Sequence, residues 1–426
     1  MKPRERVRLT LEHQEPDRVP LDVGGTPVTG MHVSSVYGLR QHLALDAPGE
    51  PVKVTNIYQM LGEIKPDLAE ALGVDVIPLP RPKNSFGIDN RDWKEWTTPN
   101  GTPVLVPGGF NTDPGPDGDI LMYPQGNKDA APSGRMPAGG YYFDAIERQP
   151  PLDDQTLRVE DNLEEFGPLS AEELDFFRRE AERLHAETDM AVVANMGGTG
   201  FGDVAHVPGV HLRNPQGVRS VQEWYLSLVK RPAFVHELFE RQCAIALDNL
   251  ERFHEAVGDR AVALFVSGTD FGGQENLLIS PRTYRELFKP FHRRINDWIH
   301  EHTSWKSFMH TDGSVSRLLP DFAEAGFDIL NPVQWTAKAM NPTELKERFG
   351  AKFTFWGAGI DTQKTLPFGT PDEVREEVRR QIETFGPGGG FVFASVHNVQ
   401  AEVPVENLLA LFEAFCAYGR YPLVDL

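Results

Sequence analysis

The second half of the chain alternates between short apolar segments typical of strands and longer amphipathic segments typical of helices. Residues 261–266 form a continuous apolar run, which indicates a strand buried on both faces. A serine-proline pair at 280–281 marks a helix start, and residues 370–373 (Thr-Pro-Asp-Glu) form a capping box with proline in the first turn. Strands that alternate with helices in this way favour a parallel sheet covered by helices.

Eight strand-like segments are present, each followed by helical sequence, and together they predict a single (β/α)8 TIM barrel of the α/β class over residues 1–426. A helix is expected between the first two strands, at residues 54–72. The alternative fold, an open doubly wound sheet, needs a Gly-x-Gly-x-x-Gly turn after its first strand, and that turn is missing. The predicted strands cover residues 18–23, 75–79, 190–195, 261–266, 305–309, 328–330, 353–356 and 391–394.

Residues 81–169 break the alternation. They are rich in Gly, Pro, Asn and Asp and contain short β-like pieces, which predicts a β-rich insertion after the second strand. Loops of this length are functional lids or disordered linkers, and the tryptophans and tyrosines of this segment favour an ordered one. The insertion is therefore expected at the barrel mouth, either as a substrate lid or as a structural or dimerisation flap.

The charge of the chain excludes several classes of protein. Its 42 Lys and Arg residues are outnumbered by 62 Asp and Glu residues, giving a net charge of −20, which disfavours nucleic acid as a partner. No apolar run is long enough to cross a bilayer, and the charged N-terminus lacks the apolar segment of a secretory signal. Two cysteines exclude a disulfide framework. We expect a cytoplasmic protein without a membrane partner, of a size compatible with a homodimer.

Polar residues follow most of the predicted strands, at the end where a TIM barrel builds its active site. Core packing does not require this pattern, so it indicates a polar pocket at the barrel mouth. Asp270 and Glu275 are candidate catalytic residues, although they could equally cap the turn and helix that follow them. The candidate substrate-binding residues are Asp22, Asn195, Gln274, Asn331, Gln334 and Trp335.

His310 and Asp312 are the sharpest pair of candidates. Residues i and i+2 at a strand end point to the same side, so both side chains are expected to face the barrel axis. His397, at the end of the last strand, could approach the same point, and both histidines are candidate catalytic residues. Two imidazoles and a carboxylate suit Zn²⁺ or another divalent ion, with a position left open for substrate. The alternative is a set of hydrogen-bonded polar residues that lines a pocket without metal.

Several of these segments resemble the uroporphyrinogen decarboxylase superfamily. The resemblance covers most of the chain outside the insertion, and it implies the TIM barrel fold. The segments are 4–7 (Arg-Glu-Arg-Val), 15–20 (Glu-Pro-Asp-Arg-Val-Pro), the Asp270 turn leading into 279–281, the strand end 310–313, and 388–391 with 404–407.

Within that superfamily the resemblance favours the cobalamin-dependent methyltransferases. The true decarboxylases carry Arg-Gln-Ala-Gly-Arg after the first strand for the porphyrinogen carboxylates, whereas residues 22–27 here read Asp-Val-Gly-Gly-Thr-Pro, without arginine. The methyltransferases hold Zn²⁺ through His-x-Cys near the fifth strand and a later Cys. Asp312 and His397 stand in place of those cysteines, and by register His397 also matches the histidine of the decarboxylases.

Histidine and aspartate in place of thiolates make a harder, more Lewis-acidic centre, which suits an oxygen donor. The resemblance thus implies a metal-dependent methyltransferase that moves a methyl group from a methoxylated small molecule to a corrinoid. Such an O-demethylase component needs a corrinoid protein as partner. One alternative is a metal-independent decarboxylase or lyase for a small carboxylated substrate, with Asp270 and His397 in acid–base roles. The other is a barrel used as a binding module, with the insertion as partner surface.

Overall fold

The largest sheet of the protein has seven parallel strands. The computed structural model describes residues 1–423 of the 426-residue chain. The strand order is β15-β14-β13-β12-β11-β10-β3, so neighbours in space are also neighbours in sequence within this sheet. Because all the pairings are parallel, the carboxyl ends of the strands lie at one edge. The strands are β3 (Val76–Pro78), β10 (Ala191–Ala194), β11 (Ala261–Ser267), β12 (Lys306–His310), β13 (Ile329–Asn331), β14 (Thr354–Ala358) and β15 (Phe391–Ala394).

This curled α/β sheet is consistent with a TIM-like barrel, but the segment predicted as its first strand differs from the expectation. Residues 18–23 contribute a single parallel bridge to the sheet, between Leu21 and Phe393. The N–H of Asp22 donates to the carbonyl of Phe393 over 2.9 Å, and the N–H of Asp75 donates to the carbonyl of Leu21 over 2.8 Å. The segment therefore lies between β15 and the residue that precedes β3, and these bonds hold Asp22 beside the last strand.

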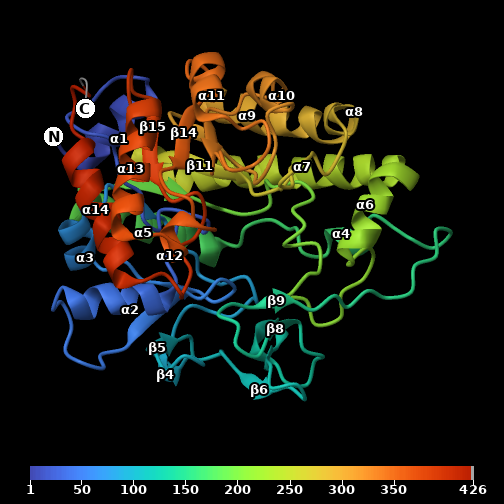
Figure 1. Cartoon of the computed structure of the whole chain (residues 1–426). Helices are drawn as coiled ribbons and strands as arrows, with labels where there is room; N and C mark the ends of the chain where they lie inside the picture. The colour runs from blue at the N-terminus through green and yellow to red at the C-terminus, as the bar shows by residue number, and fades with distance from the viewer. Residues whose placement is uncertain (424–426) are drawn as a thin grey trace.

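Helices connect the strands of the sheet and cover it (Figure 1). The predicted helix starts are present: Ser280 accepts a hydrogen bond from the N–H of Thr283, and Thr370 forms a capping box with Glu373. Within residues 1–423, no helix combines the length and the apolar character needed to cross a membrane. The helices are α1 (Pro3–Leu11), α2 (Val33–His42), α3 (Pro66–Leu72), α4 (Glu160–Leu163), α5 (Ala171–Glu187), α6 (Val221–Lys230), α7 (Pro232–Val257), α8 (Pro281–Thr283), α9 (Lys289–His302), α10 (Leu319–Glu324), α11 (Pro342–Phe349), α12 (Thr365–Phe368), α13 (Pro371–Phe385) and α14 (Val405–Tyr418).

The sheet packs apolar side chains on both faces. One cluster joins α1 to side chains from several strands of the sheet, and a larger cluster involves the surrounding helices. Continuous apolar runs such as β11, whose residues are all buried, supply both clusters at once. The first cluster is made of Val7, Leu11, Val76, Ala191, Val193, Val262, Ala263, Phe265, Phe308, Ile329, Trp356, Val392 and Ala394.

The region between the first two predicted strands is not the single helix expected over residues 54–72. Val52–Asn56 form strand β1, Leu61–Gly62 form strand β2, and only Pro66–Leu72 are helical. Burial alternates along the first three residues of β1, which is the period of a strand. The helix prediction was wrong for residues 54–65: the alternation belongs to a strand, and Pro66 sets the actual start of the helix.

Residues 81–169 are rich in short strands, as their composition predicts. Two of these strands, β4 and β5, join β1 and β2 in the order β2-β1-β5-β4, and the other four form an antiparallel meander. Both small sheets lie apart from the main sheet in Figure 1. The role of this segment as a lid or a flap stays a prediction. The strands are β4 (Lys94–Thr97), β5 (Pro103–Val106), β6 (Thr112–Pro114), β7 (Ile120–Met122), β8 (Gly134–Met136) and β9 (Asp144–Ala145).

Candidate functional site

The three predicted metal ligands lie together at the carboxyl end of the main sheet. His310 is the last residue of β12, Asp312 follows it by two residues, and His397 follows the end of β15. Each residue offers one ligand atom, and these three atoms lie within 4.8 Å of one another. Oδ2 of Asp312 is 3.8 Å from Nε2 of His310 and 3.9 Å from Nε2 of His397. The parallel sheet thus brings together side chains that are far apart in the sequence.

A relay of hydrogen bonds fixes the orientation of His310. Nδ1 of His310 lies 2.6 Å from Oδ1 of Asn331, and the amide nitrogen of Asn331 donates to the carbonyl of Trp356 over 2.7 Å. Because the amide nitrogen is committed to Trp356, Oδ1 must accept a proton from Nδ1 of His310. The lone pair of His310 is therefore on Nε2, which faces Asp312. A carbonyl-type acceptor behind a histidine is the usual partner of a metal-binding imidazole.

The donor set fits a divalent cation. Bonds of about 2.0–2.2 Å from one ion to nitrogen and oxygen ligands place those ligand atoms roughly 3.3–3.6 Å apart. The separations of 3.8 and 3.9 Å between Asp312 and the two histidines approach that range, and all three ligand atoms lie within 4.8 Å of one another. The side chains of Asp312 and His397 are 31% and 30% exposed, so a ligand can reach them. Burial of the imidazole in this concave mouth lowers the pKa of His397, which favours the neutral form that binds metals.

Asp270 lies directly behind Asp312. Its Oδ1 accepts the backbone N–H of Asp312 over 2.8 Å, so this carboxylate orients the turn that carries the predicted ligand. Burial, followed by repulsion from the carboxylate of Asp312, raises the pKa of Asp270 to about 6. Among the predicted catalytic residues, Asp270 thus joins His310 and His397 at one place.

Two of the predicted substrate-binding residues, Gln334 and Asp22, use their side chains for hydrogen bonds within the protein. Oε1 of Gln334 accepts the N–H of Gly313 over 2.8 Å, next to the predicted ligand turn. Asp22 accepts the N–H of Gly25 and Nε1–H of Trp356, each over 2.7 Å. Burial raises the pKa of Asp22 to about 6. Both side chains orient backbone or rings around the cluster, as Asn331 does.

The structure does not bring Glu275 or Gln274 to the cluster. Glu275 is 74% exposed and its carboxylate lies 3.3 Å from the ammonium group of Lys338. Gln274 is exposed as well and lies 3.4 Å from Gln363. The chain turns sharply after Gly273, so these two residues face solvent although they follow the same strand as Asp270.

Asn195 and Trp335 lie at the rim. The side chain of Asn195 accepts the N–H of Gly197 over 3.0 Å and so shapes the turn that follows β10. Nε1–H of Trp335 donates to the carbonyl of Ala358 over 3.1 Å, which anchors the partly buried indole at the end of β14.

The sequence interpretation missed Arg81, which follows β3 by three residues and lies against Gly197. The signal was available, because the rule that polar residues at strand ends build the site applies to this strand as well. The segment was instead assigned wholly to the start of the predicted insertion.

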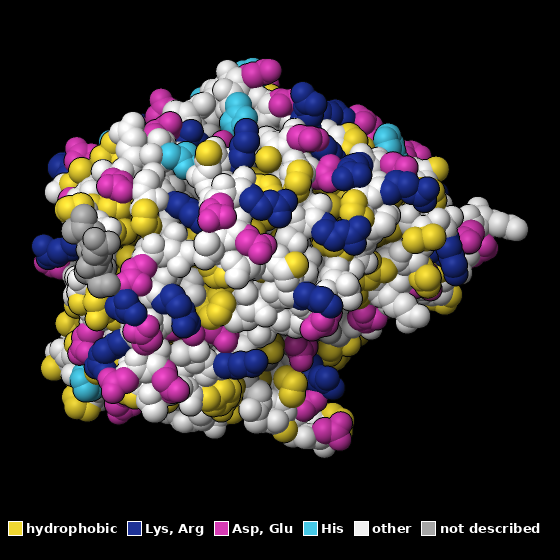
Figure 2. Space-filling view, turned by 45° about the horizontal axis from the view of Figure 1, so that its top comes forward, with side chains coloured by type: hydrophobic (Ala, Val, Ile, Leu, Met, Phe, Trp, Pro, Cys, Tyr) yellow, Lys and Arg dark blue, Asp and Glu magenta, His cyan; other side chains and the backbone are white. Residues whose placement is uncertain are grey.

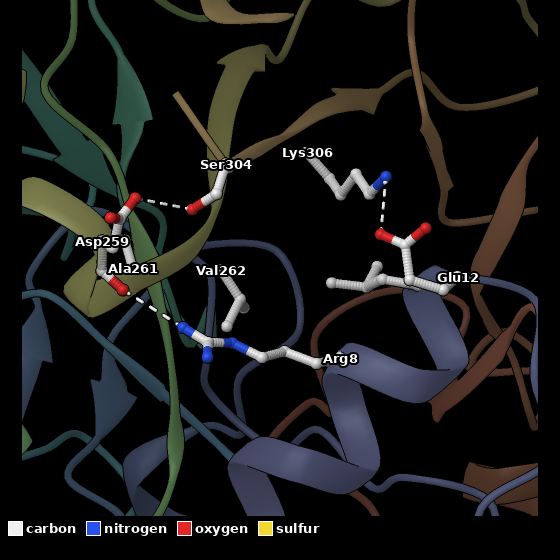
Figure 3. A pocket seen from close by; sticks show the side chains of 8 residues that line it. Arg8, Glu12, Asp259, Ala261, Val262, Ser304 and Lys306 are labelled. Atoms are coloured by element: carbon white, nitrogen blue, oxygen red, sulfur yellow. Dashed lines mark hydrogen bonds and ion pairs between the residues drawn. The ribbon is translucent and has the colours of Figure 1, made fainter. Parts of the chain in front are cut away.

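A hollow of about 390 Å³ lies at the opposite end of the sheet, between α1 and the first residues of β11 and β12. Figure 3 shows Lys306 facing Glu12, while Arg8 points to the backbone of Asp259. Nζ of Lys306 is 2.9 Å from the carboxylate of Glu12, and Arg8 donates to the backbone carbonyl of Asp259 over 3.2 Å. Lys306 and Glu12 thus neutralise each other, whereas Arg8 bonds to an uncharged carbonyl and the carboxylate of Asp259 accepts from Ser304.

Comparison with known proteins identifies relatives of this chain. The family model described as "Uroporphyrinogen decarboxylase (URO-D)" matches residues 144–418. Uroporphyrinogen decarboxylase of Crocosphaera subtropica is 24% identical over 282 residues, which are 65% of this chain and 73% of that protein. The enzyme of Pseudomonas fluorescens is 31% identical over 160 residues, 37% of this chain and 41% of its own.

Among solved structures, a methyltransferase from Methanosarcina mazei shares the fold. The TM-score is 0.55 at 16% sequence identity, over 98% of this chain and 99% of that one. Since the family model covers well over half of the chain, the family predicted from the sequence motifs is confirmed. The chain belongs to the uroporphyrinogen decarboxylase family.

Proposed function

We propose that this protein is a metal-dependent methyltransferase that moves a methyl group from a methoxylated small molecule to a corrinoid, as the O-demethylase component of a larger system. The observation that carries the proposal is the cluster of His310, Asp312 and His397 at the carboxyl end of the sheet. The structural neighbour from Methanosarcina mazei, a methyltransferase by name, supports the reaction class.

The three clustered side chains would hold Zn²⁺ or another divalent ion. When bound, such an ion supplies Lewis acidity that stabilises the oxygen from which the methyl group departs. Asn331 keeps Nε2 of His310 free for this purpose, and Asp270 holds the backbone of Asp312 in place. The ligand atoms are nitrogen and oxygen only, which favours an oxygen-bearing methyl donor over a thiol.

The corrinoid would be presented by a partner protein docked over the open end of the sheet, because methyl transfer needs a nucleophile close to the methyl group. The C–O bond of the donor would break with both electrons left on oxygen, while a reduced corrinoid would provide the electron pair for the new bond to carbon. The oxygen would then take up a proton, and Asp270, which supports the predicted ligand turn and has a raised pKa, is our candidate donor.

Metal analysis of the purified chain tests this proposal. We expect about one divalent ion per chain, lost in His310→Ala and retained in His300→Ala, whose imidazole pairs with Asp328 at the surface. Methylation of cob(I)alamin by methoxyaromatic compounds, followed by visible spectroscopy, should disappear with the metal. A metal-free protein that still demethylates the substrate would contradict the proposal.

A second candidate is a metal-independent decarboxylase or lyase acting on a small carboxylated substrate. The observation that favours it is the similarity to the curated decarboxylases, which extends over about three quarters of some of them. The absence of arginine from residues 22–27, where Asp22 is instead buried and bonded to Trp356, counts against a porphyrinogen substrate. Release of CO₂ from a carboxylate panel, without metal or cob(I)alamin, would support this candidate.

A further inference from the structure

Arg81 carries a guanidinium group that no acidic side chain neutralises. Among residues 1–423, no carboxylate lies within 4.0 Å of its nitrogens and its side chain donates no hydrogen bond. The acidic residue that acts on it from further away, Glu173, is engaged in the capping box of α5 with Ser170. Arg6 and Arg18 pair with Asp75, whereas the guanidinium N–H donors of Arg81 are free among the described residues.

The side chain of Arg81 is exposed but rests against a neighbouring loop. Its side chain is exposed to water, yet enough protein surrounds the guanidinium for desolvation to lower its pKa. A Cβ atom placed on Gly197 would come within 3.0 Å of Nη2 of Arg81, so the guanidinium occupies space that the glycine leaves open. Pro80 and Pro82 restrict the backbone on either side, and Asn90 donates to the carbonyl of Arg81 over 3.0 Å. The group is thus held in a defined place.

That place is connected directly to the predicted metal ligands. The loop that begins at Gly197 runs along the end of β11, where Thr199 donates to the carbonyl of Val266 over 2.7 Å. Thr269 donates to the carbonyl of Phe201 over 2.8 Å, and Asp270 follows it in the turn that supports Asp312. Hydrogen bonds beneath the surface therefore link the loop against which Arg81 lies to the turn that carries Asp312.

We propose that Arg81 binds the carboxylate of an extended substrate whose other end lies at His310, Asp312 and His397. A planar guanidinium with free donors is the side chain best suited to bidentate binding of a carboxylate. The strands that carry Arg81 and His310 are three positions apart in the sheet order, with about 4.8 Å between neighbouring strands. A ligand that reaches both must therefore be elongated, with its anionic group remote from the reacting end.

The charges of the rim favour a monoanion over a phosphate ester. One arginine can neutralise one negative charge, whereas Asp270 and Asp312 add negative charge beyond it along the same rim. Asp203 adds a third carboxylate, because it lies beside Gly268 at the end of β11. A dianionic group at Arg81 would be repelled by these carboxylates.

The inference rests on the proposed function only for the identity of the reacting end. Binding can be measured by calorimetry, without methyl transfer and without a corrinoid. The ligands are 4-methoxycinnamate, its neutral amide and 4-methoxyphenyl phosphate. We expect the wild-type protein to prefer the carboxylate to the amide by about tenfold or more. Arg81→Gln should abolish that preference and leave amide binding unchanged, and Arg81→Lys should retain part of it.

Arg91 provides a matched control, because it lies in the same segment but pairs with Asp89 at 2.8 Å. Arg91→Gln should keep the preference, and Arg81→Gln should keep the unfolding temperature because no hydrogen bond is removed. The proposal is overturned if the wild type shows no preference for the carboxylate, if Arg81→Gln keeps it, or if the phosphate ester binds best.

Methyl transfer to cob(I)alamin separates this proposal from the proposed function. If no methoxylated compound is demethylated but Arg81→Gln still removes the carboxylate preference, the function fails and the role of Arg81 stands. If wild type and Arg81→Gln demethylate the carboxylate and the amide alike, the function stands and the role of Arg81 fails.

Discussion

The two ends of the main sheet differ in whether their charged side chains have partners within the chain. At the amino end, Asp75 is fully buried and accepts hydrogen bonds from Arg6, Arg18 and the backbone of Leu21. At the carboxyl end, Arg81 has no acidic partner among the described residues, and His310 presents a free Nε2 to the cluster. Charges that are paired within the chain hold the fold together, whereas charges left without partners are available to ligands.

The comparison also explains which motifs report the family. The first two segments of the resemblance, residues 4–7 and 15–20, supply Arg6, Asp17 and Arg18, and these build the ion-pair network of the amino end. They specify how α1 and the following segment dock beneath the sheet. The face seen in Figure 2 likewise mixes acidic and basic side chains without a patch of one sign.

Breaking the amino-end network should have the largest effect. Asp75→Asn leaves two arginines with side chains 7% and 22% exposed without their buried counter-charge. We expect the free energy of unfolding to fall by about 3–5 kcal/mol, measured by urea denaturation. Metal bound per folded chain should not change, because the cluster lies at the other end. A loss below about 1 kcal/mol would show that this network does not stabilise the fold.

Removing the acceptor behind His310 tests the carboxyl end. Asn331→Leu deprives Nδ1 of its partner at 2.6 Å, so the imidazole is no longer held with Nε2 toward Asp312. The affinity for Zn²⁺ should fall by about 10–100-fold, measured by competition with a chelator. Asn296→Leu is the control, since this buried asparagine bonds to the carbonyl of Ala325 away from the cluster. Equal losses in both variants would contradict a specific role for Asn331.

Low pH should destabilise the protein through His32, a histidine that is buried among the carboxyl-end loops and therefore kept neutral. Nδ1 of His32 accepts the N–H of Ser34 over 3.1 Å, and Nε2 lies 2.9 Å from the carbonyl of Tyr141, in the predicted insertion. Burial lowers the pKa of His32 to about 4. Because the folded pKa is below the unfolded value of about 6.5, this stabilisation is complete above pH 6.5 and is lost as the pH falls toward 4.

The change can be measured by urea denaturation at pH 7 and pH 4.5. Over this interval the free energy of unfolding of the wild type should fall by about 2 kcal/mol more than that of His32→Gln. In the wild type, unfolding exposes an imidazole that takes up a proton at low pH, and this uptake favours the unfolded state. Parallel losses in the two proteins would show that His32 does not control the acid sensitivity of the contact with Tyr141.

The smallest effect is expected at the hollow of Figure 3. Glu12→Gln removes the ion pair with Lys306, whose two side chains are 60% and 25% exposed. Surface pairs of this kind contribute about 1 kcal/mol or less, so unfolding by urea should change little. A loss as large as that of Asp75→Asn would mean that burial does not distinguish the ion pairs of the amino end.

Much of the sheet could be predicted from the sequence because its strands are continuous apolar runs. All but one of the predicted segments are strands of the sheet, and the helix starts at Ser280 and Thr370 are capped as their patterns indicate. The exception, residues 18–23, has the composition of a strand but too few backbone bonds to its neighbours. An apolar composition predicts that a segment is buried, but whether its backbone pairs as a strand depends on the segments beside it.

Some features of the candidate site follow from local sequence rules, and others depend on distant parts of the chain. The cluster of His310 and Asp312 follows from two-residue periodicity at a strand end, a local rule. The arrival of His397 depends on the order of strands, and the free state of Arg81 depends on which acids fail to reach it. Glu275 shows the converse, because a local turn directs it to solvent although it follows the same strand as Asp270. The strand-end rule points to His397 and Arg81 as well, but a single sequence does not show which acids reach a cation or which way a loop turns.

Gly197 has a consequence for where the side chain of Arg81 can lie. Its missing side chain leaves the space against which the guanidinium of Arg81 rests, although 81 and 197 belong to different strands' loops. A methyl group at 197 and a long cation at 81 cannot share that space without a shift of one of them. Because the backbone of Gly197 is also left-handed (φ 79°), a side chain there would strain the turn and displace the tip of Arg81, so we expect Gly197→Ala to weaken any ligand contact made by that guanidinium.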